Sequence, residues 1–171
     1  MTQRYLIALG SNRRHHRHGA PRAVLAAALQ ALARDGLALE HVSPVIETAP
    51  LGPSIRRYAN AAAVVRSRLD PPDLLAHLQH VERLFGRRRS GRRWGARVLD
   101  LDVVLWSGGA WAAADLVIPH PHFRARTFVL GPAARIAPHW RDPLTGLTLS
   151  QLGYRLANRR SRRLTGGHSL P

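Results

Sequence analysis

The sequence contains neither cysteine nor lysine. Without cysteine the chain can form neither a disulfide frame nor a thiolate zinc site. Without lysine it can form no Schiff base, and it has no phosphate-binding loop of the GxxxxGK[ST] type, whose lysine contacts the phosphates. All 26 basic residues are therefore arginines. Guanidinium groups, which bind phosphate through paired hydrogen bonds, are the cations available to an anionic ligand.

Acidic residues are also scarce, 10 in all, so the formal net charge is +16. Such a charge favours anionic partners, whether nucleotides, nucleic acid or a membrane surface, and does not choose among them. Long apolar runs are missing as well. The apolar run in the N-terminal stretch MTQRYLIALGSN is too short for a signal peptide or a membrane span. We therefore expect a cytoplasmic protein with no membrane partner.

A length of 171 residues fits one domain. We expect that domain at residues 1–155, followed by a basic tail at 156–171 that is partly disordered. Hydrophobic patterning predicts strands at 4–9, 37–47, 58–68, 99–106 and 116–118, and helices at 24–33, 70–85, within 128–136 and from 152 onward. The resulting β-α-β-β-α-β order indicates an α+β protein. We expect a ferredoxin-like antiparallel sheet with helices on one face, plus C-terminal additions.

The most informative stretch is GRRRSGRRWGARVLDLD at 86–102, where six arginines precede Asp100 and Asp102. On a strand these two acids point to one face, while Leu101 points to the other. Paired carboxylates suit Mg²⁺, which takes one or two of them and completes its shell with water and phosphate oxygens. Neighbouring arginines would neutralise the remaining charge of a polyphosphate. The stretch therefore predicts a nucleotide phosphate site.

Each part of this pattern has an ordinary alternative. A D-x-D on a strand is common, and an arginine run is usually a solvated face. Trp94 favours the site, because a merely solvated loop gains little from a ring that can stack on a base or cover a guanidinium. The histidines of the insert after residue 12, His15, His16 and His18, could contact a metal or phosphate. They show no fixed ligand spacing, so we interpret them as an exposed basic loop.

A series of short motifs runs through the chain: ALGSN (8–12), ETAPLG (47–52), YAN (58–60), GRRR (86–89), RWGARVLDLD (93–102), PHP (119–121) and RTFVLGP (126–132). With these motifs the chain resembles the 6-hydroxymethyl-7,8-dihydropterin pyrophosphokinases of folate synthesis. The combination of RWG-x-R-x-LDLD with PHP-x₄-R-x-F is highly specific. The resemblance implies transfer of a pyrophosphoryl group from ATP to a pterin alcohol, with two Mg²⁺ ions. We expect a monomer.

The resemblance also implies roles for individual residues. Asp100 and Asp102 would bind both Mg²⁺ ions, and Arg87 and Arg89 would assist catalysis, Arg89 from a loop that closes over the substrates. Seven positions match the nucleotide side: Gln79, Glu82, Arg87, Trp94, Arg97, His120 and Arg126. Six match the pterin pocket: Thr48, Leu51, Tyr58, Asn60, Trp94 and Phe128. There Tyr58 and Phe128 would sandwich the flat heterocycle, and Asn60 would bind its polar edge.

Several of these residues also have a structural interpretation. Tyr58 and Phe128 could be core aromatics, His120 could cap a turn, and Glu82 could pair with an arginine. Asn60 within an apolar strand is harder to explain that way, because a buried amide needs partners.

The implied reaction is an in-line displacement at the β-phosphorus of ATP, with AMP leaving. Nothing in the sequence distinguishes Asp102, Asp100 or water as the base. One rival is an RNA-binding module, which needs exposed aromatics on its strands; no strand here has that pattern, so we expect no nucleic-acid partner. A homologue that binds without turnover is the other rival, and the intact Asp100/Asp102 pair argues against it.

Overall fold

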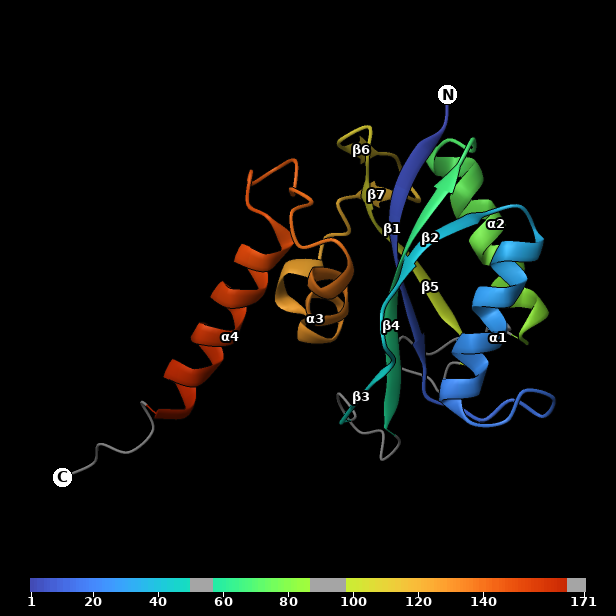
Figure 1. Cartoon of the computed structure of the whole chain (residues 1–171), viewed down its shortest axis with the longest axis horizontal. Coiled ribbons are helices and arrows are strands. Elements are labelled where there is room, and N and C mark those ends of the chain that lie inside the picture. Colours follow the sequence, from blue (N-terminus) through green and yellow to red (C-terminus); the bar gives the residue numbers. More distant parts are fainter. Residues whose placement is uncertain (50–56, 87–97, 166–171) are drawn as a thin grey trace.

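The computed structural model describes residues 1–49, 57–86 and 98–165. Its centre is a five-stranded antiparallel sheet in which β2, β4, β1 and β5 lie in that order and β3 also pairs with β4 (Figure 1). The strands are β1 (Gln3–Ser11), β2 (Ala38–Val42), β3 (Ile46–Thr48), β4 (Tyr58–Ser67) and β5 (Asp100–Trp106), with a separate two-stranded sheet of β6 (Trp111–Ala112) and β7 (Val117–Ile118). The helices are α1 (Pro21–Arg34), α2 (Pro71–Leu84), the 3₁₀ helix η1 (Phe123–Ala125), α3 (Thr127–Ile136) and α4 (Leu149–Thr165). The α+β class with an antiparallel sheet is confirmed.

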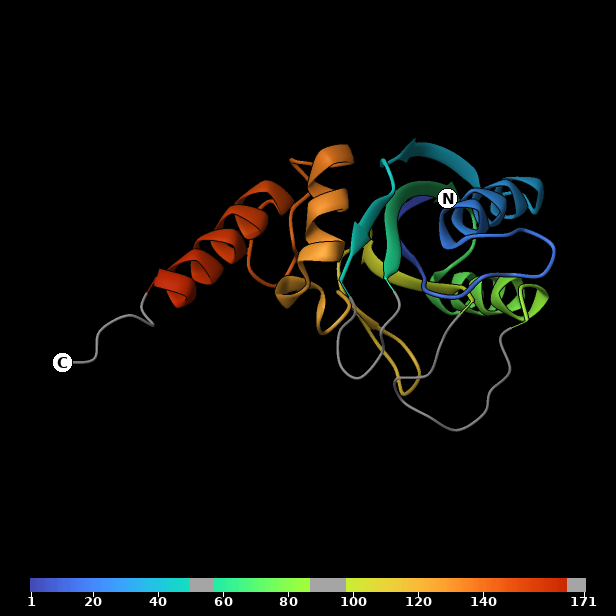
Figure 2. The same ribbon diagram turned by 90° about the horizontal axis from the view of Figure 1, so that it is seen from below.

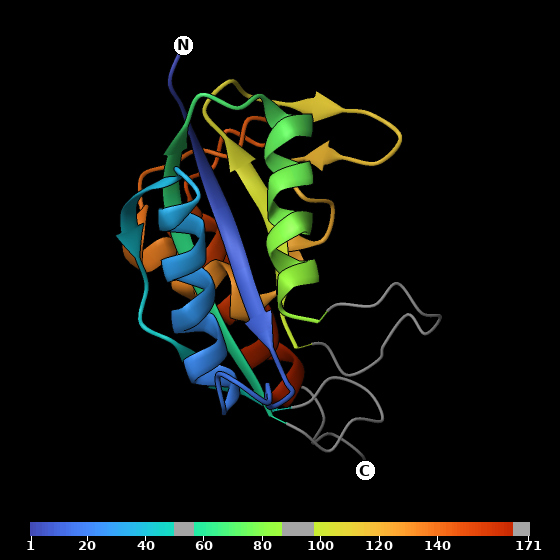
Figure 3. The same cartoon turned by 90° about the vertical axis from the view of Figure 1, so that its right-hand side faces the viewer.

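Local sequence explains where the first two helices begin and end. The Asp70 carboxylate accepts the backbone N–H of Asp73 at 3.0 Å and so caps α2, as predicted. Gly36 follows α1 with a φ of +94°, a conformation that costs glycine no steric strain. The predicted helices at 24–33 and 70–85 thus correspond to α1 and α2, although α1 begins three residues earlier. The two helices lie side by side over one face of the sheet (Figure 3).

Helices α1 and α2 share one face of the sheet, as expected, and the sheet is covered on its other face by the C-terminal part of the chain. On the face under α1 and α2, Tyr5, Ile7 and Leu9 of β1 form the larger apolar core. On the opposite face Leu6 and Val64 belong to a second core, to which α3 contributes (Figure 2). The cause is visible in β4, where a continuous small apolar run leaves no polar face for solvent.

The predicted strand at 37–47 is two strands, β2 and β3, which pair with different parts of β4. Between them the Ser43 hydroxyl accepts the N–H of Ala62 at 2.9 Å, and the Ser43 N–H donates to the Ala62 carbonyl at 2.9 Å. The next residue, Pro44, has no N–H to donate to the ladder. The chain therefore leaves the sheet at Pro44 and returns at Ile46.

Helix α4 projects away from the sheet and carries the chain to Thr165 (Figure 1). It covers most of the segment for which we expect a partly disordered tail, and residues 166–171 lie outside the described residues. Within the described ranges, no helix combines the length and the apolar character needed to cross a membrane.

Candidate active site

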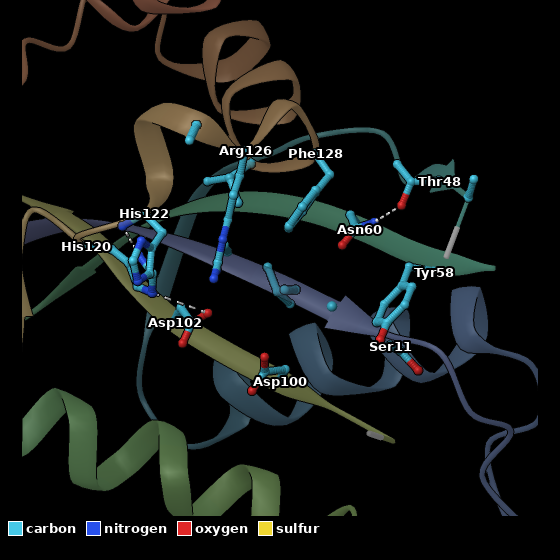
Figure 4. Close-up of a pocket in the computed structure, with 16 residues that line it drawn as sticks. Ser11, Thr48, Tyr58, Asn60, Asp100, Asp102, His120, His122, Arg126 and Phe128 are labelled. Carbon is cyan, nitrogen blue, oxygen red and sulfur yellow. Dashed lines mark hydrogen bonds and ion pairs between the residues drawn. The ribbon is translucent and has the colours of Figure 1, made fainter. Parts of the chain in front are cut away.

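A cavity of about 690 Å³ opens where β1, β3, β4 and β5 meet the segment that runs from His120 to Val129. Eight of the predicted site residues line it: Thr48, Tyr58, Asn60, Asp100, Asp102, His120, Arg126 and Phe128. Figure 4 shows that these side chains come from several elements and lie around one space. The structure thus gathers residues from position 48 to position 128 at one end of the sheet.

The two acids share the cavity face of β5, as their spacing predicts. Both line the cavity, while Leu101 between them is buried in the core. The cross-strand neighbours on β1 are Gly10 opposite Asp100 and Ala8 opposite Asp102. Side chains directly opposite each other lie about 5 Å apart. Because glycine has no side chain and alanine has only a methyl group, the space next to the carboxylates stays open.

His120 lies beside this acid pair, with its Nε2 3.9 Å from an Asp102 carboxylate oxygen. Its Nδ1 accepts the backbone N–H of His122 at 3.2 Å. Burial, and then the charges of Arg126 and His122, lowers the pKa of His120 to about 4. The ring is therefore neutral near pH 7 and carries its proton on Nε2. His120 faces the cavity as a neutral donor, and its contact with Asp102 is not an ion pair at that pH.

Arg126 contributes the guanidinium that Figure 4 shows reaching toward the acid pair. The central carbon of this guanidinium, Cζ, lies 5.8 Å from the centroid of the Phe128 ring. Arg126 stands between η1 and α3: its N–H donates to the Phe123 carbonyl at 3.2 Å, and its carbonyl accepts the N–H of Leu130 at 3.0 Å. The junction of two helices therefore sets where this arginine enters the cavity.

The segment that carries His120 and Arg126 is held by a partly buried ion pair, which we call the Arg124–Asp142 clamp. Arg124 donates from Nε and Nη2 to the two carboxylate oxygens of Asp142, each at 2.7 Å. Asp142 is 0% exposed and also accepts the Thr145 hydroxyl at 2.6 Å. Burial raises the pKa of Asp142, but the hydrogen bonds from Arg124 and Thr145 outweigh it and the net pKa is lowered. The carboxylate stays charged near pH 7.

The far end of the cavity is formed by β3 and β4. Thr48 pairs with Tyr58 across these strands, and Asn60 lies two residues along the same face. The Asn60 side-chain amide donates to the Thr48 hydroxyl at 2.9 Å, and Asn60 is only 5% exposed. Figure 4 shows Thr48, Asn60 and Tyr58 together at the opposite end from His120. This end offers an aromatic ring and a fixed amide, which suit a flat polar heterocycle.

The acid pair has the donor chemistry of a Mg²⁺ site. In the ranges that the structure describes, no group of three or more histidines and acids could hold a metal ion by itself. Two carboxylates beside an open, cationic space instead fit a Mg²⁺ that takes its other ligands from water and substrate phosphates. The residues present therefore fit a metal that arrives with a phosphate ligand.

Comparison with known proteins decides the family. Residues 6–138 match the model of the family described as 7,8-dihydro-6-hydroxymethylpterin-pyrophosphokinase (HPPK). The chain belongs to this family. The resemblance seen in the motifs is thereby confirmed, as is the enzyme class, because the curated relatives are named as pyrophosphokinases.

Two of these HPPK relatives are bacterial. The chain is 42% identical over 145 residues to the 2-amino-4-hydroxy-6-hydroxymethyldihydropteridine pyrophosphokinase of Pseudomonas aeruginosa, covering 84% of this chain and 86% of the relative. It is 41% identical over 117 residues to the protein of the same name from Synechocystis, covering 68% of this chain and 60% of the relative.

Solved structures agree on the fold. A Plasmodium falciparum HPPK-DHPS structure matches with a TM-score of 0.76 at 13% identity, over 96% of this chain and 45% of that one. The chain thus spans less than half of this longer protein, and the likeness concerns the fold alone.

Two further residues were expected on the nucleotide side of an HPPK site, and their role there stays a prediction. Neither Gln79 nor Glu82 is among the described residues that line the cavity. Glu82 is buried under β5, where its carboxylate accepts the backbone N–H of Leu101 at 2.7 Å. It therefore supports the strand that carries the acid pair. Five expected residues fall outside the described residues: Leu51, Arg87, Arg89, Trp94 and Arg97.

Two polar residues of the cavity were missed from the sequence. Ser11 lies at the end of β1, and His122 follows the PHP motif by one residue. The alternating histidines of the sequence PHPH are a pattern that could have drawn attention to His122, since alternate residues of an extended segment share a face.

Proposed function

We propose that this chain transfers a pyrophosphoryl group from ATP to 6-hydroxymethyl-7,8-dihydropterin, giving AMP and the pterin diphosphate of folate synthesis. One observation carries the proposal. The Asp100/Asp102 pair lies within one cavity between a cationic end, with His120 and Arg126, and an end with Asn60 fixed beside an aromatic ring. The site therefore has separate places for a phosphate chain and a heterocycle, with the acids between them.

The cationic end suits the nucleotide. Arg126 can bind phosphate oxygens through two of its N–H groups. Neutral His120 can donate its Nε2 proton to a phosphate oxygen without repelling a second cation, because its pKa is about 4. The clamp beneath them holds both residues in place before ATP arrives, which lowers the entropy lost on binding.

The other end suits the pterin. The Asn60 amide already donates to Thr48 at 2.9 Å, so its orientation is fixed and its oxygen is left to accept from the ring edge. Tyr58 and Phe128 both line this space and offer faces for stacking. A pterin bound here would direct its hydroxymethyl group toward the acid pair.

We assign two Mg²⁺ ions to Asp100 and Asp102, together with the phosphates of ATP. Bound there, they would neutralise phosphate charge and lower the pKa of the attacking hydroxyl. The protein's own part is to align the two substrates for an in-line displacement, to bind phosphate oxygens through Arg126 and to exclude other orientations. The sequence-based roles stay predictions for seven residues: Leu51, Gln79, Glu82, Arg87, Arg89, Trp94 and Arg97.

We further infer the ferredoxin-like plan, which the strand order β2-β4-β1-β5 and the crossings made by α1 and α2 support. A single domain at 1–155, a monomeric state and a cytoplasmic location stay predictions from the sequence.

The test is AMP formation from ATP and the pterin alcohol with Mg²⁺ present. Asp100→Asn and Asp102→Asn should each reduce turnover by more than about 100-fold, since positioning and charge stabilisation of this kind contribute that much. Their melting temperatures should stay close to that of the unchanged protein, because both acids face the cavity. Asp35→Asn, at an exposed position after α1, is the matched control. Near-normal turnover in either cavity variant would contradict the proposal.

A further inference from the structure

Among its described residues, helix α4 packs on the body of the protein through those of its first turns. Leu149 and Leu152 are buried in the second core, and Leu156 is partly buried against it. Beyond Leu156 the described residues Ala157, Asn158 and Arg159 are exposed. Figures 1 and 2 show this half of the helix extending away from α3 and the sheet. We call residues 155–163 the arm.

The composition of the helix changes at the point where it leaves the body. With 100° between successive residues, positions 149, 152 and 156 form one stripe, and positions 159, 160 and 163 continue it. The continuing positions are all arginine, whereas those that pack on the body are leucine. Adding Arg155 and position 162 gives five arginines within an arc of about 160°. The opposite arc holds Ala157, Asn158 and Ser161.

The arginines are more one-sided than exposure of a helix to solvent would require. Solubility alone would spread charges of both signs over the exposed faces. Instead, the helix from residue 149 to residue 165 contains no acid, and the arm collects one sign on one face. The described members, Arg155 and Arg159, are exposed, and none of the ion pairs found among the described residues involves either of them. Their charge is open to a partner.

We propose that the arm binds the phosphate backbone of nucleic acid. A polyanion with evenly spaced phosphates needs only a row of guanidinium groups, each able to form paired hydrogen bonds. A membrane-surface helix needs an apolar face, but here that face packs on the body, and residues 157–163 (ANRRSRR) contain no apolar side chain larger than alanine. A protein partner would be expected to use a buried apolar anchor, and Tyr154, the exposed ring nearby, lies outside the arginine arc.

This surface differs from the one excluded by the sequence. An RNA-binding module reads bases on an open sheet face, and both faces of this sheet are covered by helices. The arm would bind without reading bases, through charge alone. None of the arm's described residues lines the active-site cavity, so nucleic-acid binding and pyrophosphoryl transfer would be independent activities.

The test is fluorescence anisotropy of a labelled DNA duplex of about 20 base pairs, titrated with the full chain at several salt concentrations from about 50 to 200 mM. The variant Arg155→Gln/Arg159→Gln should bind at least about tenfold more weakly at the lowest salt. Its plot of log K against log salt should be shallower by about 1.8, because each lost phosphate contact removes about 0.9. Arg22→Gln/Arg34→Gln on α1 carries the same net charge and should stay within about twofold of the unchanged protein.

Turnover and melting temperature of both variants should match the unchanged chain, which separates a binding loss from misfolding. Three results would overturn the proposal. The first is no binding by the unchanged chain. The second is an equal loss in both variants, which would mean diffuse attraction by the net charge. The third is an arm variant that loses binding to phosphatidylglycerol vesicles but keeps its binding to the duplex, which would assign the arm to membranes.

Discussion

Removing one partner of the Arg124–Asp142 clamp should destabilise the protein by an amount that depends on which partner is removed. Asp142 is 0% exposed, whereas the Arg124 side chain is 28% exposed and its guanidinium lies 4.7 Å from the Phe123 ring centroid. In Arg124→Leu the carboxylate stays buried, with the Thr145 hydroxyl and the Leu144 N–H as its hydrogen-bond donors. In Asp142→Asn the remaining guanidinium can turn toward water. We therefore expect Arg124→Leu to be the more destabilising change.

The expected size follows from burial. Leaving a buried charge without its partner costs about 3–5 kcal/mol in the free energy of unfolding, which we assign to Arg124→Leu. Loss of charge-assisted hydrogen bonds from a partly exposed group costs about 1.5–3 kcal/mol, which we assign to Asp142→Asn. For a chain of this length, the first corresponds to about 6–20 °C in melting temperature. Arg124→Leu/Asp142→Leu, with no charge left to bury, should recover part of the loss.

Urea unfolding of the three variants measures these differences, and steady-state kinetics measures their effect on the site. The clamp holds the segment of His120 and Arg126, so the KM for ATP should rise more than the KM for the pterin. Equal losses below about 1 kcal/mol in both single variants would refute the reasoning, because they would show a solvent-screened pair of little value.

The clamp also predicts acid sensitivity. Since the folded pKa of Asp142 is lowered, the unfolded chain binds more protons as the pH falls below the ordinary aspartate value of about 3.9. The stability that Asp142 contributes is therefore complete above that pH and is lost as the pH falls through the lowered folded pKa. Asp142→Asn should flatten the stability profile in this acid range, and a profile unchanged by the substitution would contradict the assignment.

Three further predictions concern single contacts. Asn60→Ala and Phe128→Ala should weaken pterin binding far more than binding of a non-hydrolysable ATP analogue; equal losses in calorimetric titrations would make them packing residues. Arg126→Ala should weaken binding of the ATP analogue by about 1.5–3 kcal/mol and leave pterin binding nearly unchanged, which the same titrations measure. Glu82→Leu should lower the melting temperature, because the buried N–H of Leu101 loses its acceptor at 2.7 Å; unchanged stability with weaker ATP binding would contradict this support role and favour the nucleotide-side role predicted from the sequence.

Sequence patterns sufficed where a local rule decides the outcome. The spacing of Asp100 and Asp102 places both on one face of a strand whatever surrounds it, and the cap at Asp70 depends on its own first turn. Thr48, Tyr58 and Asn60 were found because family motifs record positions that meet in space. The same alternation predicted that Leu101 points into the core, where it is buried.

The features that the sequence did not indicate depend on contacts between segments far apart in the chain. The uninterrupted apolar run Ala61–Val65 already indicates a strand buried on both faces, but the helix that covers its second face comes more than sixty positions later. Glu82 can be recognised as a strand support only when β5 lies beside α2. Arg124 and Asp142 carry no motif, so their pairing emerges only from the folded chain.

The pairing of β1 has a consequence for synthesis. This strand, which ends at Ser11, lies between β4 and β5, and β5 begins only at Asp100. At about 5–20 residues per second, a ribosome needs roughly 5–20 s to make the missing partner. Throughout that interval the apolar segment YLIAL presents an unpaired edge, the kind of surface that aggregates or recruits chaperones. Strand β1 is thus synthesised well before one of its two partner strands, and its edge facing β5 is paired only once β5 has been made.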